Sequence, residues 1–373
     1  MNIKTITCHD VYNYGASLQA YALQTFLEKL GNHVEIIDYL PYYKPKRYNW
    51  LYVPEKSRLH KLSHIPIVND ICGLLCNRRE WKYWKRYKRF KFFKRNYLHC
   101  TQQTYHNIDE LNSFPPMADL YIAGSDQIWN TKYINGTDPA FYCAFVHDRN
   151  KCISYAASFA TSNLDPAWST FVKQQLSNFR NISVRELSGV KIAESLGYKA
   201  TAVLDPVFLL SKEDWESLCK KRRKGKYLIV YDFLRNDPRI RETCQRIARD
   251  QGLSIYALND GGTTDWADHN IYNAGPVEFL EWIHDANFVV STSFHATAFS
   301  VIFEREFITF PLIGHSNSSR MSDFLGSLGL NDRFIIDNSF STLKVIDYEK
   351  VNILKNDLQK ESREWLMSQL RSF

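Results

Sequence analysis

Residues 3–38 read IKTITCHDVYNYGASLQAYALQTFLEKLGNHVEIID, and this stretch decides the fold. Residues 3–8, with β-branched Ile3, Thr5, Ile6 and Thr7, look like a buried strand, and residues 17–24 place apolar side chains at helical spacing. Gly31 ends the helix, and the alternation in residues 34–38 predicts a second strand. Strand, glycine turn, helix and strand make a βαβ unit, so we expect a parallel sheet.

The turn Asn13-Tyr14-Gly15 lies in this unit between the first strand and its helix. Such a turn sits at the carboxyl edge of a parallel sheet, where the N–H groups of a helix N-terminus favour anions. The sequence contains neither GxGxxG nor GxxxxGK[ST]. It therefore gives no motif support for a dinucleotide site or a P-loop.

The α/β pattern continues along most of the chain. Further strands are predicted at residues 119–123, 152–158, 182–186, 202–206, 227–231, 253–257 and 287–291. The charged run at 220–226 contains a glycine and suits an exposed linker between domains. Since 373 residues exceed what one core usually organises, we expect two Rossmann-like α/β domains that meet at a cleft, the GT-B-like arrangement.

The predicted domain limits follow from these patterns. The N-terminal domain spans 1–222, the C-terminal domain 223–345, and a final helix 346–373. Residues 41–118 are rich in Tyr, Pro and basic residues and are interpreted as an insertion that is partly helical around 74–97.

Composition narrows the class of protein. No apolar run of 18 residues occurs, and the N-terminus lacks the features of a signal peptide, so we expect a cytoplasmic location. The eight cysteines are scattered without a CxxC pair and are expected to be reduced thiols. Cys72 and Cys76 lie one helical turn apart, but no second ligand pair is near, so no metal is expected.

Residues 82–95, KYWKRYKRFKFFKR, contain eight Lys or Arg and six aromatic residues and nothing else. The whole chain carries +7, so the rest of it has a net charge of about −1. Three interpretations remain open: a packed helix, attachment to an anionic membrane surface, and nucleic-acid binding. The aromatics do not share one helical face, which favours the packed helix, and no nucleic acid is expected as a partner.

Six segments resemble those of the polysaccharide pyruvyl transferase family, in the family's order and over about residues 1–330. They are Asn13–Ala16 with Leu18-Gln19-Ala20, Gly124–Asn130, Ser154–Phe159, Val184-Arg185-Glu186, Asp205-Pro206 and Ser293-Phe294-His295-Ala296. The resemblance implies a GT-B-like fold, phosphoenolpyruvate as donor, a glycan acceptor, and neither a metal nor another cofactor. The C-terminal domain would then hold the donor and the N-terminal domain the acceptor.

The function expected from this resemblance is transfer of the enolpyruvyl group of phosphoenolpyruvate to a sugar as a pyruvate ketal. We expect a galactose-type residue of a lipid-linked capsular or exopolysaccharide precursor, modified by an enzyme peripheral to the inner face of the membrane. Two alternatives stay open: a GT-B glycosyltransferase that uses a nucleotide sugar, and a non-catalytic glycan-binding protein.

Candidate catalytic residues are His295 and Asp126. His295 is expected in the first turn of a helix and suits a general acid, because imidazole titrates near neutral pH. Its alternative is a satisfied buried histidine. Asp126 follows a strand beside Gly124 and Ser125, and it would accept a hydroxyl proton or else cap the next helix.

Candidate donor-binding residues are Arg185, Arg320 and Ser293. Paired guanidinium donors match a carboxylate or phosphate, and the alternative for Arg185 is an ion pair with a carboxylate of the protein. Some members of the family that this sequence resembles carry a basic residue at the position of Ser293. Arg320 is the expected replacement for that charge.

Candidate acceptor-binding residues are Tyr14, Gly15, Ser125 and Trp129. Flat aromatic faces stack on sugars, and small residues let a sugar approach. Core packing is the alternative for the two aromatic side chains.

Overall fold

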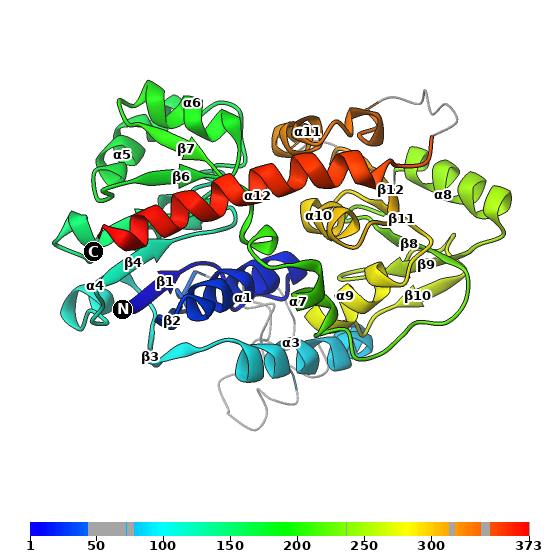
Figure 1. The fold of residues 1–373 in the computed structure, drawn as a ribbon. Helices are drawn as coiled ribbons and strands as arrows, with labels where there is room; N and C mark the ends of the chain where they lie inside the picture. Colours follow the sequence, from blue (N-terminus) through cyan, green and yellow to red (C-terminus); the bar gives the residue numbers. More distant parts are fainter. Residues whose placement is uncertain (44–71, 73–77, 236, 313–317, 337–343, 373) are drawn as a thin grey trace.

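The computed structural model describes residues 1–43, 72, 78–235, 237–312, 318–336 and 344–372. Within them lie two five-stranded parallel sheets, one in each half of the molecule, flanked by helices (Figure 1). This is the two-domain α/β fold that the sequence predicts. Cys76 and most of region 41–77 lie outside the described residues.

The first sheet has the order β3-β2-β1-β4-β5, and its elements come from the first half of the chain. They are β1 (Asn2–Ile6), α1 (Tyr14–Lys29), β2 (His33–Tyr39), β3 (Cys100–Tyr105), α4 (Ile108–Ser113), β4 (Leu120–Ala123), β5 (Cys152–Ser154) and α5 (Pro166–Leu176). A separate two-stranded parallel sheet follows, made of β6 (Ile182–Val184) and β7 (Ala200–Ala202), with α6 (Leu187–Ser195) between them in the chain. The Asn13 side chain caps α1 by accepting from Ala16 N, and Gly31 follows the helix with φ +82°.

The second sheet has the order β10-β9-β8-β11-β12. Its elements are β8 (Tyr227–Tyr231), α8 (Pro238–Gln251), β9 (Ser254–Leu258), β10 (His269–Ile271), α9 (Pro276–His284), β11 (Phe288–Ser291), α10 (Phe294–Ile302), β12 (Glu306–Thr309) and α11 (Ser318–Ser327). The central strands β8 and β11 are short, mostly apolar and buried along their whole length, as expected for a parallel sheet that is covered on both faces. Short 3-10 helices span Arg78–Tyr83, Ile134–Thr137, Pro139–Tyr142, Arg149–Lys151, Pro206–Phe208 and Asn331–Arg333.

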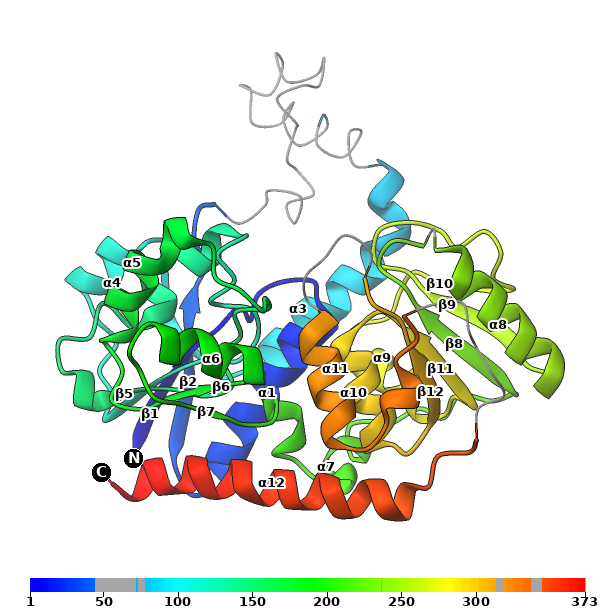
Figure 2. The same ribbon diagram turned by 90° about the horizontal axis from the view of Figure 1, so that it is seen from above.

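Three helices tie the two halves together. α7 (Lys212–Glu216) lies on the connection between them, and α3 (Trp84–Tyr97) runs along both at the lower edge of Figure 1. α12 (Tyr348–Arg371) returns from the second half to the first (Figure 2). Near its end, the side chain of Gln369 accepts from Asn181 Nδ2 at 2.6 Å. One apolar cluster also crosses between the halves, and in it Tyr14 stacks on Phe279 with ring centroids 4.5 Å apart.

The interpretation of residues 41–118 as an insertion was too broad. Strand β3 pairs with β2 and completes the first sheet, and α4 packs beside it. The sequence of β3, CTQQTY, is polar because it is an edge strand, so the alternation that reveals a half-buried strand is weak there.

Candidate functional site

Three side chains from different segments meet where the two domains face each other. Arg185, directly after β6, donates from Nη1 to Asp205 Oδ2 at 2.6 Å. His295, in the first turn of α10, places Nε2 3.4 Å from the same carboxylate oxygen. Asp205 is fully buried, as is the Arg185 side chain apart from 1% of its surface. The predicted alternative for Arg185, an ion pair with a carboxylate, is therefore present.

Phe294 forms a platform for two guanidinium groups. Arg185 Cζ lies 4.9 Å and Arg320 Cζ 5.8 Å from the centroid of its ring. The amide oxygen of Gln127, in the side-chain orientation that satisfies both neighbours, accepts from Arg320 Nη1 at 3.1 Å and Nη2 at 2.9 Å. Burial and the nearby charge of Arg185 lower the pKa of Arg320 to about 10, so both arginines are charged at neutral pH.

Several buried donors at this platform have no acceptor within the described part of the chain. They are Nε and Nη2 of Arg185, Nε of Arg320 and Nε2 of His295. Asp126 Oδ1 lies 3.6 Å from Arg185 Nη2, which is an ion pair without a hydrogen bond. Because buried donors normally find partners, this group is suited to an anionic ligand with several oxygens.

The two acidic neighbours of Arg185 differ in their surroundings. The Asp126 side chain keeps 19% of its surface exposed, at the end of β4, and no helix follows for it to cap. Glu186 is buried, and its Oε1 accepts from Ser158 Oγ and from the N–H groups of Phe159 and Ala160. Burial raises the pKa of Glu186. Through these hydrogen bonds the Glu186 side chain holds the loop at residues 158–160 beside the site. Asp126 is thus the acid with access to a ligand.

Gly15 fixes the position of the imidazole from the opposite domain. A Cβ atom at residue 15 would lie 1.9 Å from Nδ1 of His295, so only glycine leaves room for the ring. Gly15 is in the first turn of α1, and His295 is in the first turn of α10. Two helix N-termini therefore meet at this histidine, and both favour a bound anion.

Ser293 has a local role. It is the N-cap of α10, and its hydroxyl accepts from Ala296 N. The oxygen therefore helps to hold the helix that carries His295, while contact between Ser293 and the donor stays a prediction. Ser293 orients the first turn.

The predicted acceptor-binding residues Tyr14, Ser125 and Trp129 are core residues. Trp129 is completely buried and stacks on Tyr142, with ring centroids 5.3 Å apart. Ser125 donates to the carbonyl of Ala156, and Tyr14 donates to the carbonyl of Ala274 across the domain boundary. None of the three has an exposed surface on which a sugar can bind, because their side chains are buried in contacts within the protein.

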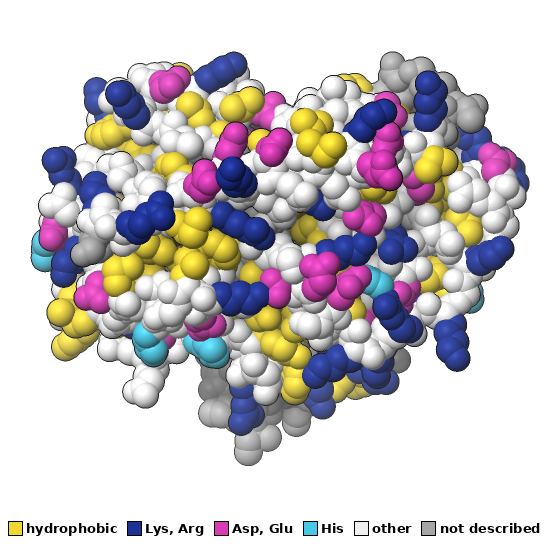
Figure 3. Space-filling view, in the orientation of Figure 1, with side chains coloured by type: hydrophobic (Ala, Val, Ile, Leu, Met, Phe, Trp, Pro, Cys, Tyr) yellow, Lys and Arg dark blue, Asp and Glu magenta, His cyan; other side chains and the backbone are white. Residues whose placement is uncertain are grey.

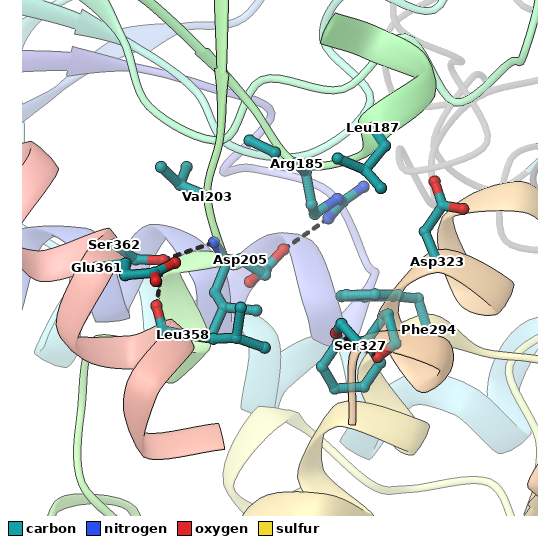
Figure 4. A pocket seen from close by; sticks show the side chains of 13 residues that line it. Arg185, Leu187, Val203, Asp205, Phe294, Asp323, Ser327, Leu358, Glu361 and Ser362 are labelled. Atoms are coloured by element: carbon teal, nitrogen blue, oxygen red, sulfur yellow. Dashed lines mark hydrogen bonds and ion pairs between the residues drawn. The ribbon is translucent and has the colours of Figure 1, made fainter. Parts of the chain in front are cut away.

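A cavity of about 250 Å³ opens beside the arginine platform, between α6, α11 and α12. Figure 4 shows Arg185 turned toward Asp205 at its inner end, with Asp323 of α11 and Glu361 of α12 on different sides. Phe294 and Phe324 supply aromatic surface. Both domains contribute residues to the walls, which carry carboxylates and aromatic faces.

A possible metal-ligand group lies elsewhere and was not singled out from the sequence. His9, Asp38 and Cys100 bring their ligand atoms within 4.8 Å of one another. The Lys94 ammonium already lies 2.7 Å from Asp38 Oδ1, and burial raises the pKa of the Cys100 thiol to about 12. A lysine thus supplies the positive charge that a metal would bring.

The sequence model of the family described as polysaccharide pyruvyl transferase matches residues 13–312, which contain Gly15, Asp126, Arg185, Asp205 and His295. The chain belongs to this family. It is accordingly a transferase, and the resemblance of the six sequence segments is confirmed. No curated protein matches the sequence.

Solved structures similar to this member of the pyruvyl transferase family have a GT-B fold. The UDP-GlcNAc 2-epimerase of Methanocaldococcus jannaschii, in complex with UDP-GlcNAc and UDP, superposes with a TM-score of 0.51 at 10% identity, over 96% of this chain and 93% of that one. The epimerase of Neisseria meningitidis, bound to UDP-GlcNAc, gives 0.50 at 9% identity over 100% of both chains. Such low identities establish the fold alone.

Sequence reasoning brought His295, Arg185, Arg320 and Asp126 into one site but did not assign Asp205 a role. The residues Gln127, Glu186 and Phe294 were also missed. All four lie inside segments that resemble the pyruvyl transferase family, so the signal was present. Their contacts run between segments far apart in the chain, which a linear pattern does not reveal.

Gly15→Ala is expected to lower pyruvyl transfer by about 100-fold, because the added methyl group forces the His295 ring out of position. Steady-state turnover measures the loss, and circular dichroism checks the fold. Gly261→Ala is the control, since a Cβ there meets no atom within 4 Å. Full activity of Gly15→Ala would show that the imidazole does not need its observed position.

Asp205→Asn is expected to destabilise the protein by about 3–5 kcal/mol at neutral pH, because it leaves the Arg185 charge buried without its partner. Burial opposes ionisation, but His295 and Arg185 outweigh it and hold the pKa of Asp205 well below its usual range. The carboxylate therefore stabilises the fold above its unfolded pKa of about 3.9, and this contribution is lost as the pH falls toward the folded pKa.

Urea unfolding of wild type and Asp205→Asn across pH tests this sign. The difference in unfolding free energy should be largest near neutral pH and shrink below about pH 4. Asp250→Asn, at an exposed position on α8, serves as the control and should not change stability. A difference that grows on acidification would contradict the assignment.

Proposed function

We propose that this transferase moves the enolpyruvyl group of phosphoenolpyruvate to two hydroxyls of a sugar, forming a pyruvate ketal and releasing inorganic phosphate. The observation that carries the proposal is the group of acceptor-less buried donors on Arg185, Arg320 and His295 around Phe294. Phosphoenolpyruvate offers a carboxylate and a phosphate, and these oxygens suit guanidinium donors.

The reaction needs a proton on the methylene carbon of phosphoenolpyruvate and attack by a sugar hydroxyl on the adjacent carbon. The His295 imidazole gives the proton; its Nε2 lies 3.4 Å from Asp205 Oδ2 and makes no hydrogen bond among the described residues. Asp126 takes the proton of the first hydroxyl as its oxygen bonds to the carbon. The bond between this carbon and the phosphate-ester oxygen then breaks with its electrons on that oxygen. The oxygen of the second hydroxyl bonds to the carbon and closes the ketal, and its proton goes to the released phosphate.

Asp205 contributes to this reaction through its neighbours. One carboxylate touches both Arg185 and His295, so it fixes the guanidinium toward the donor and stabilises a positively charged imidazole. The reaction changes no oxidation state, so acid–base chemistry and charge neutralisation are sufficient. We therefore propose that phosphoenolpyruvate enters as a substrate and that no other cofactor takes part.

For the acceptor, we propose a galactose-type residue of a lipid-linked capsular or exopolysaccharide precursor, modified on the cytoplasmic side of the membrane. The support is family membership together with the cavity next to Arg185. In it Asp323 and Glu361 are placed to accept from sugar hydroxyls, and Phe324 offers a face for the sugar's C–H groups.

Thermal shift measures the donor preference directly. Phosphoenolpyruvate is expected to raise Tm in a concentration-dependent way, because it binds only the folded protein. UDP-GlcNAc is the matched comparison, since the similar epimerase structures contain it. Stabilisation by UDP-GlcNAc and none by phosphoenolpyruvate would replace this proposal with nucleotide-sugar chemistry.

A further inference from the structure

The outward face of α3 and of Trp81-Lys82 before it is basic and aromatic, and α3 itself contains no acidic residue. We call it the α3 face; its exposed residues are Trp81, Lys82, Trp84, Lys85, Lys88, Lys91, Phe92 and Arg95. They recur at spacings of three and four, so they form one stripe along the helix. Three large aromatic side chains within it are about half exposed, which is costly in water unless the surface has a partner.

The opposite face of α3 fixes this stripe to the body of the protein. Arg86 is buried and donates to the carbonyl of Tyr12 at 2.6 Å, and Tyr83 donates to the carbonyl of Gly262 at 2.7 Å. Arg89 pairs with Glu278 of the second domain at 2.9 Å. Because the inner face is held by both domains, the α3 face is displayed in a fixed direction.

The aromatic residues of the block at 82–95 therefore divide into two groups. Tyr83, Tyr87, Phe90 and Phe93 are buried against the protein, which agrees with the packed-helix interpretation. Trp84 and Phe92 point outward together with the lysines, and Lys88 Nζ lies 4.4 Å above the Trp84 ring. One face of α3 is thus packed against the protein, and the other face presents aromatic and basic side chains to the solvent.

The charges of the α3 face are not balanced by the protein's own acids. Asp10 and Asp38 pair with Lys94, and Glu278 pairs with Arg89, both outside the exposed stripe. Among the described residues, Lys85, Lys88 and Lys91 take part in no salt bridge. In Figure 3 dark-blue side chains gather along the lower edge of the molecule, where Figure 1 places α3.

We propose that the α3 face binds an anionic phospholipid surface. Exposed Trp and Phe side chains enter the interface between headgroups and acyl chains, and lysine stems extend to the phosphates. Each basic residue near an anionic bilayer adds to the attraction, and the stripe contains five of them. A single-stranded nucleic acid instead requires a groove with stacking platforms, whereas α3 lies at an outer edge of the fold.

No helix in the described part of the chain is long and apolar enough to cross a membrane. The proposed contact is therefore with the surface of the bilayer, and it does not depend on the proposed transfer reaction.

Binding is measured by co-sedimentation of the full chain with two kinds of vesicle. One kind is made of phosphatidylcholine alone, and the other of phosphatidylcholine and phosphatidylglycerol in equal parts. We expect binding only to the anionic vesicles at about 150 mM NaCl and release at high salt.

The variant Lys85→Gln/Lys88→Gln/Lys91→Gln is expected to lower partition into anionic vesicles by on the order of 100-fold. Trp81→Ala/Phe92→Ala tests the apolar contribution and is expected to reduce binding that remains at high salt. The matched control replaces three exposed lysines elsewhere, Lys173, Lys191 and Lys199, by glutamine and should bind as the wild type does.

Three results would overturn the proposal. They are equal sedimentation with neutral and anionic vesicles, equal losses in the α3 and control triple variants, and tighter binding of a single-stranded oligonucleotide than of anionic vesicles at the same salt. The last result would assign the α3 face to nucleic acid. Unchanged circular dichroism of the α3 variants ensures that lost binding is not lost folding.

Discussion

His295→Asn is expected to lower pyruvyl transfer by about 10²–10⁴-fold while the protein stays folded. Asparagine fills much of the same space at the start of α10 but cannot donate a proton to carbon. The protein is expected to stay folded, because Arg185 still pairs with the buried Asp205 at 2.6 Å when the imidazole is removed. Turnover of phosphoenolpyruvate, followed by release of inorganic phosphate, measures the effect, and urea unfolding checks the fold.

His99→Gln is the matched control for this variant. His99 is exposed and pairs with Glu28 at 2.7 Å on the surface of the first domain, so its replacement should leave turnover unchanged. Since an exposed ion pair contributes little, stability should also stay the same. If His295→Asn kept wild-type turnover, the general acid would have to be another group, and the chain would fit a binding protein better.

Arg185→Lys is expected to cost at least about 10²-fold in kcat/KM for phosphoenolpyruvate, although the positive charge remains. Arginine holds Asp205 with one nitrogen and keeps Nε and Nη2 for a ligand, whereas an ammonium is a point charge without this geometry. Lysine also loses the stacking of the guanidinium on Phe294. The loss should appear as a raised KM together with a lowered kcat.

Arg223→Lys is the matched control, because Arg223, like Arg185, pairs with a carboxylate and stacks on an aromatic ring. Arg223 also pairs with a carboxylate, that of Glu281, and its Cζ lies 4.6 Å from the centroid of the Trp282 ring, but it belongs to the linker between the domains. Its replacement tests the general cost of losing a stacked ion pair. Equal losses of kcat/KM in the two variants would mean that Arg185 acts through the fold and not through the donor.

Much of the fold follows from local pattern. The βαβ unit at the start is predicted because its apolar spacings, Asn13 and Gly31 agree on one structure. The helix with His295 in its first turn is predicted from the apolar run after Ser293, and the structure shows that Ser293 is its N-cap. Strand β3 was missed because a polar edge strand carries no alternation.

The site was predicted less completely than the fold. Local sequence shows that Arg185 ends a strand, but its pairing with Asp205 and stacking on Phe294 depend on how the domains approach. For Trp129, by contrast, the sequence analysis predicted a binding role that the structure does not support. The side chain is completely buried, as aromatic residues near a site often are. The requirement for Gly15 became visible only when His295 was placed against it.

The most direct test of the central claim is the reaction itself, run in D₂O with phosphoenolpyruvate and a panel of galactosides and read by mass spectrometry and NMR. Proton delivery to the methylene carbon predicts a product heavier by one pyruvate less one water, with one deuterium in a new methyl group and one phosphate released. His295→Asn should form little of it. A product that keeps the vinyl group, or sugar transfer from UDP-GlcNAc with none from phosphoenolpyruvate, would contradict the account.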